Sequence, residues 1–224
     1  NHDRGYSPWS TLWPRAWAPV LEIDGARVDL GASLAGTDVL GRHAYRAGFT
    51  WPVARPAADM RYQRGARPEY ALSYAYDRWR PTVVVTLAER LDVTTVQDQQ
   101  TSRLLRADVR TREAFVGIVV PWRQVRHAQR LMLGVDVVAD RLAPGADQAI
   151  PSRARNAWRA GWWFNTARTY GYSISPEEGL RATWTIERVS PKLGASAESI
   201  TGAVDVRAFL PGGGAHRVVA LRVA

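Results

Sequence analysis

Apolar and polar side chains alternate with a period of two along most of this chain. In residues 42–52, RHAYRAGFTWP, the ring-bearing Tyr45, Phe49 and Trp51 share one parity, whereas Arg46 and Thr50 lie at the positions between them. Successive side chains of a β-strand leave opposite faces of the backbone, so this period indicates a strand with one apolar and one polar face. Because the pattern recurs throughout the sequence, we predict an all-β protein.

The predicted strands are long. They lie at 13–23, 27–35, 42–52, 69–77, 81–90, 114–122, 130–139, 157–165, 180–188, 204–210 and 219–223. Lengths of roughly 9–11 residues suit a tilted crossing of a lipid bilayer, whereas the strands of globular proteins average about 5–6 residues. The strand pattern therefore favours an antiparallel transmembrane β-barrel.

The connections between the predicted strands alternate in length. Long connections are expected at 53–68, 92–112, 141–156 and 190–202, and shorter ones at 37–41, 77–81, 124–128, 173–179 and 211–216. Asp24 and Gly25 predict a tight turn in the first hairpin. Outer-membrane barrels have long loops outside the cell and short turns in the periplasm. This asymmetry predicts a bacterial outer-membrane protein with its N-terminus in the periplasm.

The two faces of such a barrel meet different solvents. The lipid side must be apolar and carries aromatic rings near its ends, while the water-filled interior accepts charge. We predict lipid-facing or girdle positions for Tyr45, Phe49, Trp51, Tyr76, Trp79, Trp122, Trp158, Trp162 and Trp184. We predict that the interior is lined by Asp29, Arg46, Asp136, Arg159, Arg181, Glu187, Asp205, Arg207 and Arg222. A water-soluble barrel or sandwich with an apolar core would show the same alternation and stays open as the alternative.

The composition restricts the classes of protein that fit. No run approaches the roughly 18 apolar residues of a transmembrane helix, and without cysteine there is neither a disulfide framework nor a thiolate metal site. The formal charge of +9 would suit nucleic acid, but Lys192 is the only lysine among the 30 basic residues, and the arginines are spread along the chain. We therefore expect no nucleic-acid partner. Ten tryptophans are an unusually large number for a water-soluble domain of 224 residues.

No catalytic or metal-binding motif stands out. His2, His43, His127 and His216 lie far apart in the sequence, and neither a G-x-S-x-G elbow nor a P-loop is present. Gly212–Gly214 lies between two predicted strands with no helix to receive a phosphate, so it indicates a flexible turn. We expect no enzyme activity, cofactor or metal; an outer-membrane hydrolase carried by the barrel is a further alternative.

Several stretches resemble the barrel domain of the bacterial surface antigen family: YSPWSTLWPRAWAP, GASLAGTDVLGRHAYRAG, YSISPEEG with SPKLG, and VDVRAFLPGGGAHRVVALRV. This superfamily includes the central subunit of the barrel-assembly machinery and the two-partner secretion transporters, and the chain is most similar to the branch with an upstream Tol-type β-propeller. The resemblance implies a sixteen-stranded barrel. The family's Arg-Gly-Phe motif and C-terminal aromatic residue are absent, and the chain stops at ALRVA, so we expect it to supply about the first eleven strands.

The sequence thus predicts a periplasmic N-terminal segment at 1–19 and an outer-membrane barrel domain at 20–224, truncated at its C-terminus. The expected role is membrane-embedded assembly, export or pore formation, and the expected partners are outer-membrane lipid and either an upstream β-propeller in the same polypeptide or periplasmic factors. A water-soluble binding module would not need detergent for solubility, which separates it from the membrane barrel.

Overall fold

A computed structural model describes residues 6–24, 27–54, 68–97, 104–142, 153–171, 173, 175–214 and 217–224. Over these residues the chain forms one antiparallel sheet in which each strand pairs with its neighbour in sequence. The strands are β1 (Ala16–Asp24), β2 (Arg27–Thr37), β3 (His43–Ala54), β4 (Glu69–Tyr76), β5 (Thr82–Gln97), β6 (Leu104–Arg123), β7 (Ala128–Leu142), β8 (Arg153–Asn165), β9 (Gly179–Val189), β10 (Ser199–Pro211) and β11 (Val218–Val223). The all-β prediction is confirmed. In the parts of the chain covered, no helix combines the length and apolarity of a membrane span.

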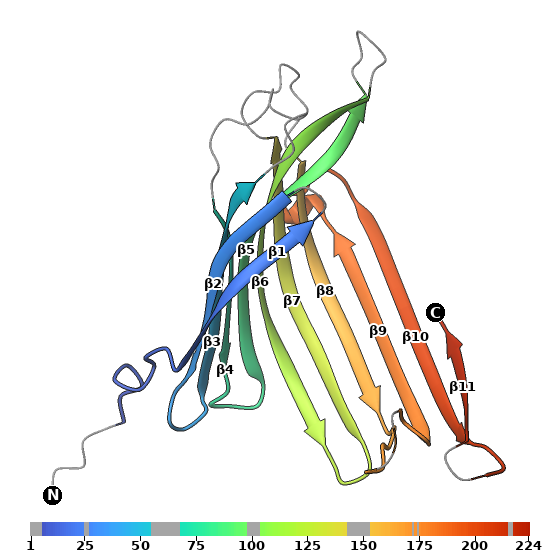
Figure 1. Ribbon diagram of the computed structural model, residues 1–224. Helices are drawn as coiled ribbons and strands as arrows, with labels where there is room; N and C mark the ends of the chain where they lie inside the picture. The colour runs from blue at the N-terminus through green and yellow to red at the C-terminus, as the bar shows by residue number, and fades with distance from the viewer. Residues whose placement is uncertain are drawn as a thin grey trace, which may run out of the picture.

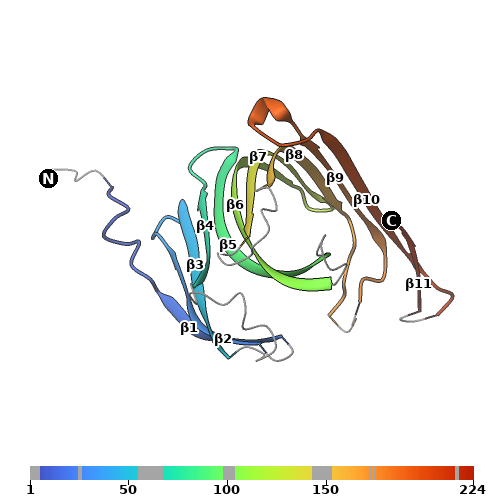
Figure 2. The same ribbon diagram turned by 90° about the horizontal axis from the view of Figure 1, so that it is seen from above.

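The sheet is strongly curved and open. Figure 2 shows it from above as an arc with β1 and β11 at the two ends. These two strands are the edges of the sheet and do not pair with each other in the described part of the chain, so no closed barrel is formed. The described residues thus form a single open sheet of eleven strands.

Two predicted connections are wrong in extent. The segment 92–112, predicted as a loop, is mostly a long hairpin, because β5 has 16 residues and β6 has 20. Their pairing continues without interruption from Arg90↔Thr111 to Gln97↔Leu104. Once a hairpin ladder is in register, each added pair satisfies two more backbone groups, and a change of side-chain pattern does not end it. Likewise β10 begins at Ser199, inside the predicted loop 190–202, where a 3₁₀-helix (Pro191–Leu193) follows β9.

The connections alternate between the two ends of the sheet. One end of the sheet, the lower end in Figure 1, carries the described part of the N-terminal segment, the turns at 38–42, 77–81 and 124–127, and the described residues of 166–178 and 212–217. We call this the short-turn end. The connection at 166–178 is longer than predicted and contains an isolated bridge between Arg168 and Glu178. β1 begins at Ala16, within the segment assigned to 1–19, and the predicted Asp24–Gly25 turn falls partly outside the described residues.

Cross-strand partners in an antiparallel sheet lie on the same face, so the register sorts every strand residue. The rows Trp162↔Trp184↔Val204 and Arg181↔Arg207↔Arg222 illustrate the apolar face and the polar face. Eight of the nine predicted girdle residues lie on the apolar face, and Trp79 lies in the 77–81 turn. All nine predicted interior residues lie on the polar face.

The polar face is the more crowded of the two. Asp136 is only 1% exposed and Phe115, Val138, Ala157 and Val189 are also buried. Side chains converge on the concave side of a curved sheet and diverge on the convex side, so this burial identifies the polar face as concave.

Candidate functional site

Arg159 is the centre of the charge network on the polar face. Its guanidinium Nη2 lies 2.6 Å from the Asp136 carboxylate and 2.8 Å from that of Glu187, and Nη1 lies 3.9 Å from Glu113. The four side chains come from β6, β7, β8 and β9, which the register places side by side. Arg155 adds a weaker contact to Glu187 at 3.9 Å. One guanidinium therefore joins three carboxylates across four strands.

The ring of Phe115 covers two glycines on the polar face. Gly117 and Gly134 are cross-strand partners, and a β-carbon on either would lie 2.5 Å from a ring atom of Phe115. The aromatic ring takes the space of the missing side chains and shields the exposed glycine backbone, a packing device known in sheets. Only glycine leaves room for it.

Substituting Gly134 by alanine should lower the free energy of unfolding by about 1–3 kcal/mol, the usual range for overpacking. The added carbon would also lie 2.7 Å from the Val116 carbonyl oxygen, so moving the ring alone does not relieve the clash. Gly161→Ala is the matched control, because the nearest atoms there are 3.6 Å away, at ordinary contact distance. Urea unfolding in detergent measures both variants; equal midpoints would contradict the packing described for Phe115.

The charges of the polar face are separated along the strands. Arg46, Arg130, Arg181, Arg207 and Arg222 lie within five residues of the short-turn ends of their strands. The acidic residues Asp29, Glu113, Asp136 and Glu187 lie at the ninth residue or beyond, counted from the same ends. The short-turn half of the polar face is therefore rich in arginine, whereas the far half combines these carboxylates with arginines such as Arg155.

Three arginines form a direct cross-strand row, Arg181↔Arg207↔Arg222. Like charges directly opposite each other repel. Asp205 offsets part of this repulsion, since its carboxylate accepts from Arg207 at 2.9 Å and from Arg222 at 2.8 Å. The Arg181 guanidinium lies 5.8 Å from the ring centroid of Phe209, and Arg130 lies 5.2 Å from that of Trp163. The arginines that stack on aromatic rings and the two that share Asp205 therefore present positive charge to the space on the concave side.

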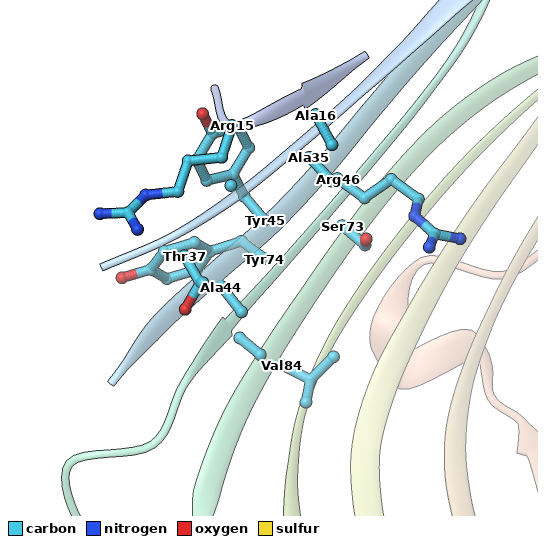
Figure 3. A pocket seen from close by; sticks show the side chains of 12 residues that line it. Arg15, Ala16, Ala35, Thr37, Ala44, Tyr45, Arg46, Ser73, Tyr74 and Val84 are labelled. Carbon is cyan, nitrogen blue, oxygen red and sulfur yellow. The ribbon is translucent and has the colours of Figure 1, made fainter. Parts of the chain in front are cut away.

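Small side chains leave open space on the concave side beside β1–β5. An open hollow of about 570 Å³ lies there, lined by Ala16, Ala35, Ala44 and Ala75 among others. Figure 3 shows that consecutive side chains at its edge leave opposite sides of the strands: Tyr45 and Tyr74 lie to one side and Arg46 to the other. The alanines thus give the concave side its free space.

The N-terminal segment is anchored at the short-turn end. The Tyr45 hydroxyl donates to the Leu12 carbonyl at 2.8 Å, and the Tyr6 hydroxyl donates to the buried Asp38 carboxylate. Burial raises the pKa of Asp38, but the His43 amide at 2.8 Å and the Tyr6 hydroxyl outweigh it and hold this pKa below its ordinary value. The carboxylate therefore stays charged and keeps the segment attached near neutral pH.

In the strand residues that the structure describes, the apolar face carries charge only near the end with the long connections. There Glu89 pairs with Arg110 and, at 2.8 Å, with Arg112, and Arg188 pairs with Glu198 at 3.0 Å. Toward the short-turn end the register gives this face no further Asp, Glu, Lys or Arg within the described strands. Its boundary there is aromatic: Tyr76 packs edge-on against Trp79 with ring centroids 5.4 Å apart, and Trp162 stacks on Phe164 at 5.6 Å. The apolar face is thus a band with two distinct borders.

Sequence reasoning missed several members of these clusters. Glu113 and Arg130 share the parity of the polar face but were not selected. Phe115 and Trp163 break the apolar parity of their strands because they belong to the polar face, where one covers glycines and the other stacks against Arg130. For Phe115, the sequence signal is an aromatic residue at a position of polar-face parity, with glycines at the same parity in its own strand and in the next strand.

Among the residues that the structure covers, no three His, Cys, Asp or Glu side chains are grouped as a metal site would require. No protein family model, curated protein or solved structure matches this chain. The resemblance to the bacterial surface antigen family thus rests on the sequence stretches quoted above.

Proposed function

We propose that this sheet is the wall of a transmembrane β-barrel in a bacterial outer membrane, with a non-catalytic role in assembly, export or pore formation. The resemblance to the bacterial surface antigen family supports this role and implies that further strands complete the barrel. Closure would pair the free edges of β1 and β11, which a bilayer core does not tolerate unpaired.

One observation carries the proposal: the apolar face is the exposed one. Phe49, Leu133 and Trp184 are 52%, 44% and 38% exposed, while the most buried large side chain is Asp136. A water-soluble sandwich would bury the first three in its core and leave the carboxylate in water. An exposed apolar surface that continues across eleven strands is far larger than the patches of water-soluble monomers.

The height of the apolar band also fits a membrane. On β6 the band runs from Arg112 at its charged border to Trp122 at its aromatic border. Ten residue steps cover about 33 Å along a strand, or about 25 Å along the membrane normal at a tilt near 40°. Known outer-membrane barrels have an apolar band of about that height.

Extraction and gel mobility test the proposal. The protein should stay in the membrane fraction after washing at high salt, dissolve in detergent, and migrate differently on gels before and after boiling. Recovery in the soluble fraction without detergent, together with a single gel mobility, would contradict a membrane barrel.

A water-filled barrel with this interior should prefer anions. In planar bilayers at neutral pH we expect a chloride-over-potassium permeability ratio above one, because rings of arginine favour anions. Arg181→Glu combined with Arg207→Glu and Arg222→Glu should invert the preference. Arg188→Glu, on the apolar face, is the control and should leave the ratio unchanged. If the permeability ratio does not change with the interior substitutions, the assignment of this face to the pore is contradicted.

A further inference from the structure

At the short-turn end, exposed rings lie beside arginines that form no ion pair within the described part of the chain. Trp79 and Trp122 are 61% and 44% exposed. Beside them, Arg78, Arg80, Arg123 and Arg126 are exposed, and none forms an ion pair among the described residues. We call these six residues the short-turn rim.

The two turns that carry the rim, both within the described part of the chain, contain little negative charge. Asp77 is the one carboxylate in the 77–81 turn and accepts a hydrogen bond from Thr82 at 2.8 Å. The 124–127 turn, QVRH, contains no acidic residue. The two turns lie two strands apart in the sheet, about 10 Å, so their arginines act on one region.

The two rings of the rim are continuous with the apolar face, whereas Arg123 ends β6 at a polar-face position, opposite Ala128. Trp79 packs against Tyr76, and Trp122 pairs with Gln129 on the same face as Leu131 and Leu133. The turn tips are apolar as well: Val125 is fully exposed, and Val39 and Leu40 are exposed in the neighbouring 38–42 turn. Turns that face only water are rich in polar residues. These exposed apolar turn residues are therefore suited to the boundary between water and a lipid layer.

We propose that the short-turn rim binds the phosphate groups of anionic phospholipids in the leaflet at this end of the barrel. Tryptophan rings lie between acyl chains and headgroups, and guanidinium groups form charge-assisted hydrogen bonds with phosphate oxygens. An acidic protein partner would match the arginines but would leave the apolar band beside them without a role. The inference rests on the proposed membrane barrel and adds its lipid preference.

Quenching of tryptophan fluorescence by brominated lipids tests this directly. The purified protein is reconstituted in vesicles of phosphatidylcholine and phosphatidylglycerol in which one lipid or the other is brominated. Quenching should show that phosphatidylglycerol associates roughly threefold to tenfold more strongly, since each arginine near an anionic surface adds appreciable attraction. The variant R78Q/R80Q/R123Q/R126Q keeps every tryptophan and should reduce this ratio to about one.

The matched control, R130Q/R181Q/R207Q/R222Q, removes the same charge from the concave face and should keep the lipid preference. Heat-modifiable gel migration checks that both variants fold. Equal association of the two lipids with the unchanged protein, or a preference that survives the rim substitutions, overturns the inference while leaving the barrel intact. Absence of quenching by either lipid contradicts the barrel itself.

Discussion

Leu133→Arg should lower the free energy of unfolding by about 2–4 kcal/mol, the cost measured for a basic side chain on the lipid face near the bilayer midplane. Leu133 is the sixth residue of the 15-residue β7 and lies on the apolar face opposite Ile118 and Ala160. Reversible urea unfolding in phospholipid vesicles, followed by tryptophan fluorescence, measures the change.

The size of this loss of stability separates the two folds that the alternation allows. In a water-soluble protein, arginine at an exposed leucine costs little and improves solubility. Thr185→Arg is the control: it adds the same side chain at an exposed position of the polar face and should change the stability by less than about 1 kcal/mol. If Leu133→Arg and Thr185→Arg are tolerated equally, the apolar face does not meet lipid.

Arg159→Gln should cost about 3–5 kcal/mol, the range for breaking a buried ion pair. The substitution removes the guanidinium that contacts Asp136, Glu187 and Glu113 and leaves the weaker Arg155 contact to Glu187. Asp136 is buried too deeply for water to replace the lost guanidinium. The same unfolding measurement applies.

A second substitution identifies the cause of that loss. Asp136→Asn in the Arg159→Gln protein should restore part of the stability, because it removes the buried charge that lost its partner. Arg222→Gln is the comparison for the loss of an exposed guanidinium and should cost at most about 1 kcal/mol. If Asp136→Asn brings no recovery, the Arg159 network does not act through charge.

The period-two pattern predicted the order and type of the strands well, because each face of a sheet needs one kind of side chain. It also predicted that Asp136, Arg159 and Glu187 share one face. Their mutual contacts, and the contact with Glu113, could not be predicted from parity alone, because they depend on the stagger of β6–β9, which places residues far apart in sequence in adjoining rows.

The wrong prediction for the β5–β6 connection and the missed role of Phe115 also have physical causes. The β5–β6 hairpin extends to Gln97 and Leu104, although its side-chain pattern resembles a loop, because backbone pairing carries the strands beyond the apolar band. The Phe115 ring over Gly117 and Gly134 depends on neighbours in two strands, and a single-strand pattern treats it as an irregularity.

The alanine-lined hollow beside β1–β5 has a consequence for transit through the proposed barrel. Bulky charged side chains crowd the opposite arc, so the widest passage would run off-centre, along a smooth lining of methyl groups. A molecule taking that route would pass Ala35 and Ala44, with Arg15 and Arg46 at the edge of the hollow, and would meet the row Arg181↔Arg207↔Arg222 only across the gap. Filling the eccentric passage, for example with Ala44→Trp, would narrow the channel without touching a single charge.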